Sequence, residues 1–169
     1  MSAWNQQSLE ALAAEVGHLL LANGERLATA ESCTGGWVGQ CLTAIAGSSG
    51  WFDCGFVTYS NTAKIEILGV GADTLSAQGA VSEATAGAMA LGALRRSRAD
   101  WAVAITGIAG PAGGSPGRPV GTVCFAWAGP EGRLETDSQH FQGDREAVRA
   151  QSVAYALAGV LQRASCRIG

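Results

Sequence analysis

Residues 101–105, Trp-Ala-Val-Ala-Ile, form a strand pattern in which polar and apolar residues do not alternate. Alternation is typical of a strand with one face in water, so a run without it indicates a strand that is covered on both faces. Helical periodicity occurs on both sides of this run and alternates with further strand patterns along the chain. The sequence therefore predicts an α/β fold with three layers, in which a sheet lies between two layers of helices.

The expected elements follow in the order α, β, α, β, α, α, β, β, β, α. Helix patterns cover residues 8–22, 37–45, 60–68, 82–94 and 143–164, and strand patterns cover residues 26–29, 51–59, 101–105, 120–128 and 134–141. Residues 129–132 read as a hairpin turn, so the last two strands run antiparallel. We therefore expect a mixed, mostly parallel sheet in an α/β/α sandwich, with 134–141 at an edge. Ser8 is expected to cap the first helix, and residues 69–73 are expected to form a turn.

Length, charge and cysteine content narrow the class of protein. The chain has 169 residues and a net charge of −3 without any block of like charges. This indicates one domain, residues 1–169, with neither nucleic acid nor a membrane as a partner. The five cysteines are scattered without a Cys-x-x-Cys pair, which favours a reducing compartment over a disulfide framework or a zinc site. No secretory signal or membrane-length apolar run is present, so we expect a cytoplasmic protein.

The stretch Ala30–Gly36, with the sequence AESCTGG, lies between the first strand and the second helix. In an open α/β sheet, ligands bind at the carboxyl ends of strands, and a helix that begins there presents unpaired N–H groups. Ser32 or Thr34 could therefore be a nucleophile, with nearby amides to hold an oxyanion or a phosphate. The alternative is that one of these hydroxyls simply caps the helix.

A second polar segment, residues 106–117, follows the apolar strand and holds five glycines. Glycines let backbone N–H groups approach an anion closely, and a loop of this length inside a compact domain is usually functional. The segment does not end in the Gly-Lys-Ser/Thr of a Walker loop. Arg145 lies in the first turn of the last helix, where a cation opposes the helix dipole but could clamp an anion. The alternative for 106–117 is a plain surface loop.

The polar groups predicted at strand ends or glycine corners indicate a class of reaction. They are Ser32, Thr34, Ser48, Ser49, Tyr59, Lys64, Thr106 and Arg145. Neither His18 nor His140 lies at a corner, which disfavours a Ser-His-Asp triad. A lysine is then the remaining base for a serine, provided that its pKa falls from about 10.4 toward about 7–8. The set favours acyl transfer or amide hydrolysis on a substrate that carries an anion.

Six successive motifs of the chain resemble those of the CinA C-terminal domain family. The members of this family are nicotinamide-nucleotide amidohydrolases, also called nicotinamide mononucleotide deamidases. The motifs are residues 29–36, 46–49, 55–61 with Lys64, 79–83, 106–111 and 119–123. The chain is similar to the stand-alone form of the family over nearly its whole length. The resemblance implies hydrolysis of the carboxamide of nicotinamide mononucleotide to nicotinate mononucleotide and ammonia, a step of pyridine-nucleotide recycling.

Carried over by position, the resemblance implies that Ser32 is the nucleophile, Lys64 its base, and Tyr59 a group that positions or relays the proton. Backbone amides near Ser32 or around Ser48 and Ser49 are the candidate oxyanion hole. Substrate contacts are expected from Glu31, Thr34, Ser48, Ser49, Thr106, Gly107, Gly110 and Arg145, with Arg145 on the phosphate. No metal and no cofactor is expected.

Two other functions stay open. One is a nucleotide-binding regulatory module without turnover, because part of the family is associated with competence and DNA damage. The other is a small phosphatase or phosphotransferase using Ser32 or Thr34, although the corners show no paired carboxylates to hold its metal. A homo-oligomer, with a dimer favoured, is expected through the helix at 82–94 or the edge strand at 134–141.

Overall fold

A five-stranded sheet forms the centre of the computed structural model, which describes residues 3–166. The strands are β1 (Leu27–Glu31), β2 (Phe52–Val57), β3 (Trp101–Gly107), β4 (Thr122–Ala128) and β5 (Leu134–His140), in the order β2-β1-β3-β4-β5. β1 pairs in parallel with β2 and β3, whereas β4 is antiparallel to both β3 and β5. The mixed, mostly parallel sheet is confirmed, because only β4 runs against the other strands.

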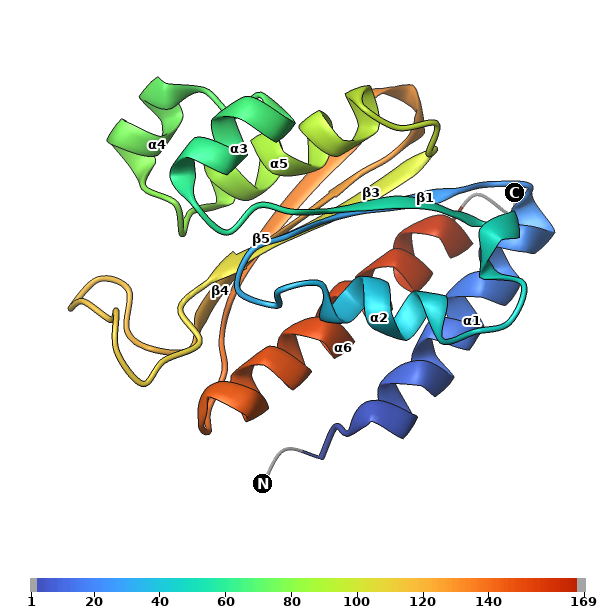
Figure 1. Ribbon diagram of the computed structural model, residues 1–169, viewed down its shortest axis with the longest axis horizontal. Coiled ribbons are helices and arrows are strands. Elements are labelled where there is room, and N and C mark those ends of the chain that lie inside the picture. Colours follow the sequence, from blue (N-terminus) through green and yellow to red (C-terminus); the bar gives the residue numbers. More distant parts are fainter. Residues whose placement is uncertain (1–2, 167–169) are drawn as a thin grey trace.

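Helices cover both faces of this sheet, as the three-layer prediction requires (Figure 1). α1 (Gln6–Asn23), α2 (Trp37–Thr43) and α6 (Arg145–Ser165) lie on one face. α3 (Asn61–Leu68), α4 (Ala72–Gln78) and α5 (Glu83–Arg95) lie on the other. No helix among residues 3–166 is both long and apolar enough to cross a bilayer.

The two faces of the sheet carry side chains of different size. Large side chains point toward α1 and α6, namely Leu27, Val103, Ile105, Val123, Phe125 and Trp127. The face toward α5 is lined by Ala28, Ala30, Ala102, Ala104, Ala126 and Ala128. α5 also meets α3 closely, since a Cβ on Gly92 would lie 2.1 Å from the backbone oxygen of Leu68. Small side chains therefore let α5 pack tightly against both the sheet and α3, and α3 carries Lys64.

Two local expectations differ from the structure. The sequence predicts a turn at 69–73 and no helix after it, whereas residues 72–78 form α4, because this short helix buries only Leu75 and so shows no apolar stripe. α1 begins at Gln6 with Asn5, not Ser8, as its cap. Ser8 instead closes a capping box: its hydroxyl accepts from the Asn5 N–H, and its own N–H donates to the Asn5 side chain.

Candidate active site

The Ser32 corner lies at the carboxyl end of β1, between the ends of its two parallel neighbours. The Ser32 N–H donates to the Ile105 oxygen of β3 at 2.9 Å, and the Thr58 N–H, just past β2, donates to the Glu31 oxygen at 2.9 Å. The hydrogen bonds that pair β1 with β2 and with β3 thus continue to the corner and fix its backbone. The Ser32 side chain remains slightly open, with 8% of the residue exposed.

Lys64 brings a buried amine to this serine. Its Nζ lies 3.0 Å from Ser32 Oγ and donates to the Thr58 oxygen at 2.8 Å. The local fold explains the placement: Ser60 caps α3 directly after β2, and helical side chains lean toward the N-terminus of their helix. The Lys64 side chain is therefore directed back to the end of the sheet.

The environment of Lys64 favours its neutral form. The residue is only 1% exposed, and burial lowers the pKa of its amine from the ordinary value. Among residues 3–166, no carboxylate forms an ion pair with it. Lys64 is also the only lysine of the chain, since the other ten basic residues are arginines. A buried lysine without an acidic partner, in contact with a serine hydroxyl, has the arrangement of a general base and its nucleophile.

Glu31 has a different role from the expected substrate contact. Its carboxylate accepts hydrogen bonds from the N–H groups of Val38 and Gly39 at 2.9 and 3.0 Å. Glu31 therefore caps the start of α2 from inside the protein and complements the helix dipole. These two amides are consequently not available to a substrate anion.

Some of the other backbone N–H groups of the corner already have acceptors. The N–H of Ser32 is used by β3, that of Gly35 donates to the Ser32 oxygen, and that of Trp37 donates to the Thr34 oxygen. Within residues 3–166, the N–H groups of Cys33, Thr34 and Gly36 have no acceptor in another residue. Any oxyanion hole formed by this corner must therefore draw on these three positions.

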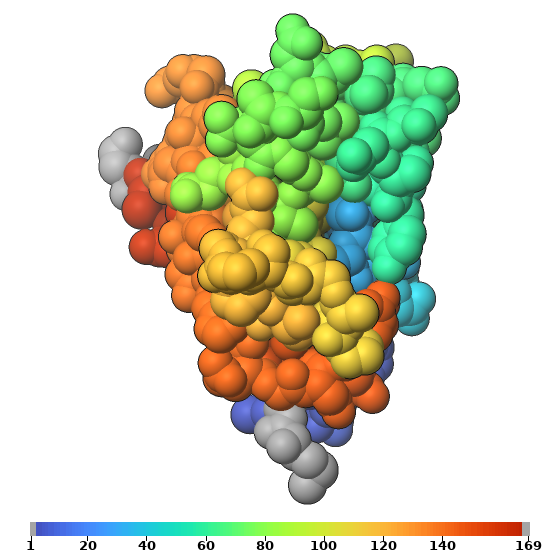
Figure 2. Space-filling view, turned by 90° about the vertical axis from the view of Figure 1, so that its left-hand side faces the viewer, coloured from blue at the N-terminus to red at the C-terminus, as the bar shows by residue number. Residues whose placement is uncertain are grey.

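Several predicted residues line one cleft of about 210 Å³. They are Ser32, Tyr59, Lys64, Thr106, Gly107 and Arg145, joined by Cys33, Asn61, Ala80, Val81 and Ala109. In Figure 2, the 108–121 loop (yellow) and the segment around residue 60 (teal) flank a hollow in which the chain near residue 30 (blue) is visible. The structure thus brings the serine, the lysine and the arginine together from β1, α3 and α6.

Contacts across the cleft are made by Arg145. Its guanidinium donates to the Gly110 oxygen at 2.8 Å and to the Tyr59 hydroxyl at 3.0 Å. Tyr59 therefore contacts Arg145, while the Ser32 hydroxyl is bonded to Lys64. The Thr106 hydroxyl donates to the Ala80 oxygen at 2.7 Å, which ties the end of β3 to the loop before α5.

Besides Glu31 and Gly110, three predicted residues do not line this cleft, namely Thr34, Ser48 and Ser49. Ser48 and Ser49 form a 3-10 turn before β2, and the Ser49 oxygen accepts from Arg26, the residue before β1. They therefore lie at the amino end of the parallel strands, opposite Ser32. Thr34 is fully buried, with its hydroxyl unpartnered among the described residues, and does not line the cleft.

Arg149 of α6 contacts this corner, although the sequence patterns did not single it out. It donates to the Cys33 oxygen at 3.1 Å and to the Thr34 oxygen at 3.0 Å, and its guanidinium lies 5.3 Å from the Trp37 ring centre. The available signal was its spacing, because Arg145 and Arg149 are four residues apart and so share one face of α6.

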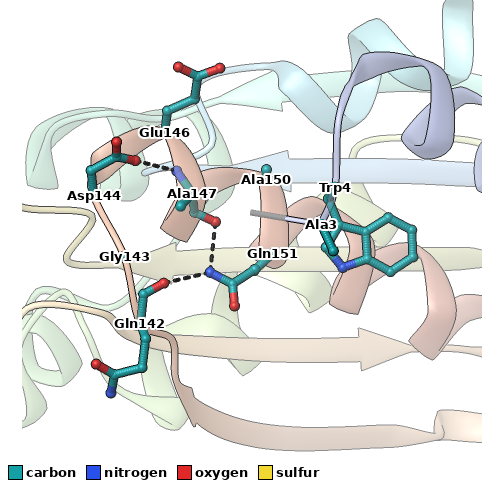
Figure 3. Close-up of a pocket in the computed structure, with 9 residues that line it drawn as sticks. All are labelled: Ala3, Trp4, Gln142, Gly143, Asp144, Glu146, Ala147, Ala150 and Gln151. Atoms are coloured by element: carbon teal, nitrogen blue, oxygen red, sulfur yellow. Dashed lines mark hydrogen bonds between the residues drawn. The ribbon is translucent and has the colours of Figure 1, made fainter. Parts of the chain in front are cut away.

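A larger hollow of about 610 Å³ lies elsewhere, at the start of α6 (Figure 3). Trp4 and Gln151 line it, and Gln151 donates to the backbone oxygens of Gln142 and Ala147. Asp144 caps α6 by accepting from the Ala147 N–H. Neither Ser32 nor Lys64 lines this hollow, so volume alone does not locate the reactive groups.

Comparison with known proteins identifies the family of this chain. The CinA C-terminal domain model matches residues 9–164. Nicotinamide-nucleotide amidohydrolase PncC of Escherichia coli (strain K12) is 55% identical over 152 residues, which are 90% of this chain and 92% of that protein. PncC of Enterobacter agglomerans is 52% identical over 158 residues, or 94% of this chain and 96% of that protein.

A solved structure shows the same fold. The competence/damage inducible protein CihA from Agrobacterium tumefaciens superposes with a TM-score of 0.90 and 45% identity, covering 96% of this chain and 98% of that one. With the curated relatives, this similarity assigns amidohydrolase activity to the chain. The match over nearly all of its length means that the chain belongs to the CinA C-terminal domain family.

Proposed function

We propose that the protein hydrolyses the carboxamide of nicotinamide mononucleotide to nicotinate mononucleotide and ammonia, with Ser32 as nucleophile and Lys64 as base. One observation carries the proposal: a buried amine, with no acidic partner among residues 3–166, lies 3.0 Å from a serine hydroxyl inside a cleft. The name of the PncC relatives, nicotinamide-nucleotide amidohydrolase, supports this class of substrate.

The chemistry follows from the neutral form of Lys64. As Ser32 Oγ bonds to the carboxamide carbon, Lys64 Nζ takes the hydroxyl proton and the carbonyl oxygen becomes an oxyanion. When the C–N bond breaks, Lys64 returns that proton to the departing nitrogen, which leaves as ammonia. Water then attacks the ester on Ser32, assisted again by Lys64, and releases the carboxylate. The cationic pyridinium of the substrate would further favour a neutral lysine.

The phosphate is assigned to the Arg145 side of the cleft. An arginine binds phosphate through two parallel N–H bonds, and Arg145 is exposed at the start of α6. In the present arrangement its donors meet the Gly110 oxygen and the Tyr59 hydroxyl, which a phosphate could replace. The Tyr59 hydroxyl, once replaced at Arg145, can donate its proton to a phosphate oxygen. We therefore propose that Tyr59 assists binding of the substrate.

The test is release of ammonia from nicotinamide mononucleotide, measured with EDTA present. We expect turnover by the wild type and a loss of at least about a hundredfold in Lys64→Ala, because the base is gone. Ser76→Ala, on the exposed surface of α4, is the control and should keep wild-type rates.

Other outcomes would point to the other functions. A silent wild type whose melting temperature rises with the nucleotide would indicate a binding module. Release of phosphate that EDTA abolishes would indicate a metal-dependent phosphatase.

A further inference from the structure

Asn61 is a polar residue of the cleft that the proposed reaction does not use. It is the first residue of α3, directly after the Ser60 that caps this helix, and it lines the cleft together with Ser32 and Lys64. Asn61 and Lys64 are three residues apart and therefore share one face of α3. The same helix thus presents two polar side chains to the cleft, of which Lys64 is buried and Asn61 is exposed.

The carboxamide of Asn61 is open to a ligand. Within residues 3–166, neither its oxygen nor its nitrogen forms a hydrogen bond with another residue of the cleft. By contrast, the hydroxyls of Ser32 and Thr106 and the guanidinium of Arg145 each have a partner in the protein. A side-chain amide offers an acceptor oxygen and two N–H donors. A ligand that enters the cleft therefore meets both kinds of group at Asn61.

Asn61 lies between the two ends of the cleft along the chain. Two residues before it, the Tyr59 hydroxyl contacts Arg145. Three residues after it, the Lys64 amine contacts Ser32. Three residues of helix rise by about 4.5 Å along the axis, so Asn61 begins α3 one turn before Lys64. The start of α3 therefore places Asn61 on the side of Lys64 that faces Tyr59.

The ribose is the part of the proposed substrate that lies at the corresponding place. It joins the reacting ring to the phosphate, so with the carboxamide at Ser32 and the phosphate at Arg145 it must cross the cleft between them. Its two neighbouring hydroxyls can each donate and accept. A side-chain amide matches such a pair, because its oxygen accepts from one hydroxyl and its N–H donates to the other. The side chains of Ala80 and Val81, which also line the cleft, can do neither.

We infer that Asn61 is a further substrate-binding residue, whose carboxamide binds the 2′- and 3′-hydroxyls of the ribose. The inference rests on the proposed function and concerns the part of the substrate that neither Lys64 nor Arg145 recognises. The ribose hydroxyls do not change during amide hydrolysis, so these bonds are equally strong in the bound substrate and in the transition state. Bonds of this kind lower KM and leave kcat unchanged.

The experiment compares Asn61→Ala with the wild type in kinetics and in binding. KM for nicotinamide mononucleotide should rise about tenfold with kcat changed less than about threefold, because uncharged hydrogen bonds are lost. Calorimetry then measures binding of nicotinate mononucleotide and of its 2′,3′-dideoxy analogue. The variant should bind the first about tenfold more weakly than the wild type does. It should bind the second within about twofold of the wild type, because this analogue lacks both hydroxyls.

Thr62→Ala is the matched control. Thr62 is the next residue of α3, is exposed like Asn61, and does not line the cleft. We expect KM, kcat and both binding constants to stay at wild-type values. Equal losses in Thr62→Ala and Asn61→Ala would mean that the start of α3 is disturbed, and would overturn the inference.

Three other results would contradict the ribose contact. One is a wild-type KM in Asn61→Ala. Another is a tenfold loss of binding that persists with the dideoxy analogue, because Asn61 would then contact a different part of the nucleotide. The third is a fall in kcat at constant KM, which would place Asn61 at the reacting carboxamide.

Failure of the proposed function has a different signature. A wild type that binds the nucleotide but releases no ammonia would contradict the hydrolysis, and the calorimetric comparison would still decide the ribose contact. A wild type that neither binds nor releases ammonia would overturn both.

Discussion

Two corners of this chain look alike in sequence and differ in position. Ser32 lies in a small polar stretch that ends in two glycines, and Ser48 and Ser49 lie between Gly47 and Gly50. The first follows β1 and meets Lys64, whereas the second precedes β2 and meets Arg26 before β1. In a β-α-β unit with parallel strands, the strand-to-helix corner lies at the carboxyl end and the helix-to-strand corner lies at the amino end.

The comparison shows that connectivity decides which serine lies in a cleft beside a lysine. At the carboxyl end, the turn after β1, the start of α3 after β2 and the end of β3 converge on one cleft. At the amino end, the 3-10 turn Ser48–Gly50 has no side-chain cap. No lysine lies beside it, because Lys64 is the only lysine of the chain and lies at the carboxyl end. Substitutions at the two corners should therefore have very different effects on activity.

Substitution of Lys64 is the strongest test of the carboxyl-end corner. We expect Lys64→Met to lose about a thousandfold or more in kcat/KM for nicotinamide mononucleotide, because Ser32 then has no base. Lys64→Arg should lose as much, because a guanidinium keeps its charge and cannot accept a proton. Steady-state kinetics measures both. Substantial activity in Lys64→Arg would mean that the residue acts only as a cation.

The pH dependence sharpens the same assignment. In the proposed mechanism the neutral amine is the base, so kcat/KM should rise about tenfold per pH unit below the pKa of Lys64 and level off above it. Burial lowers that pKa, so the rise should end below the ordinary lysine value of about 10.4. A rate profile between pH 5 and 10 checks this. A flat profile, or a rise that ends only near 10.4, would contradict a buried lysine base.

Arg145 should separate binding from chemistry at this corner. We expect Arg145→Met to raise KM for the nucleotide about tenfold or more with a smaller change in kcat, because the phosphate loses its bidentate partner. Nicotinamide riboside, which lacks the phosphate, provides the comparison. The variant should discriminate between the two substrates less than the wild type does. Equal discrimination by both proteins would remove Arg145 from the phosphate.

Glu31 tests how the first corner is held together. The carboxylate of Glu31 accepts from two N–H groups of α2, whereas the amide of Glu31→Gln has one acceptor oxygen and leaves one of these N–H groups without an acceptor. The free energy of unfolding should therefore fall by about 1–3 kcal/mol. Glu83→Gln is the matched control, since Glu83 lies exposed in the first turn of α5 and should contribute about 0.5 kcal/mol. Urea unfolding measures both changes. Equal losses would mean that the Glu31 bonds add nothing beyond a general dipole effect.

The fold was largely predictable because its signals are local and repeated. The unbroken apolar run at 101–105 indicated a strand covered on both faces, and the structure buries it fully. The edge strand at 134–141 was visible in its polar positions, which alternate in burial along β5. α4 was not predictable, because one buried leucine in seven residues forms no pattern.

The site was predictable only in part, because residue type does not specify direction. The sequence indicated Ser32, Lys64 and Arg145, and the structure brings them to one cleft. Glu31 was assigned to substrate with the other residues of its motif, but its side chain turns to α2 and accepts from the Val38 N–H. Arg149 was missed because its partners are backbone oxygens more than a hundred residues away in sequence.

The most direct measurement is release of ammonia from nicotinamide mononucleotide by two serine variants, one from each corner, beside the wild type. We expect Ser32→Ala to retain at most about a thousandth of the wild-type rate, because the nucleophile is absent. Ser49→Ala should stay within about twofold of the wild type, because its corner lies at the amino end of the sheet. Activity in Ser32→Ala, or loss of activity in Ser49→Ala, would contradict the assignment of catalysis to the Ser32 corner.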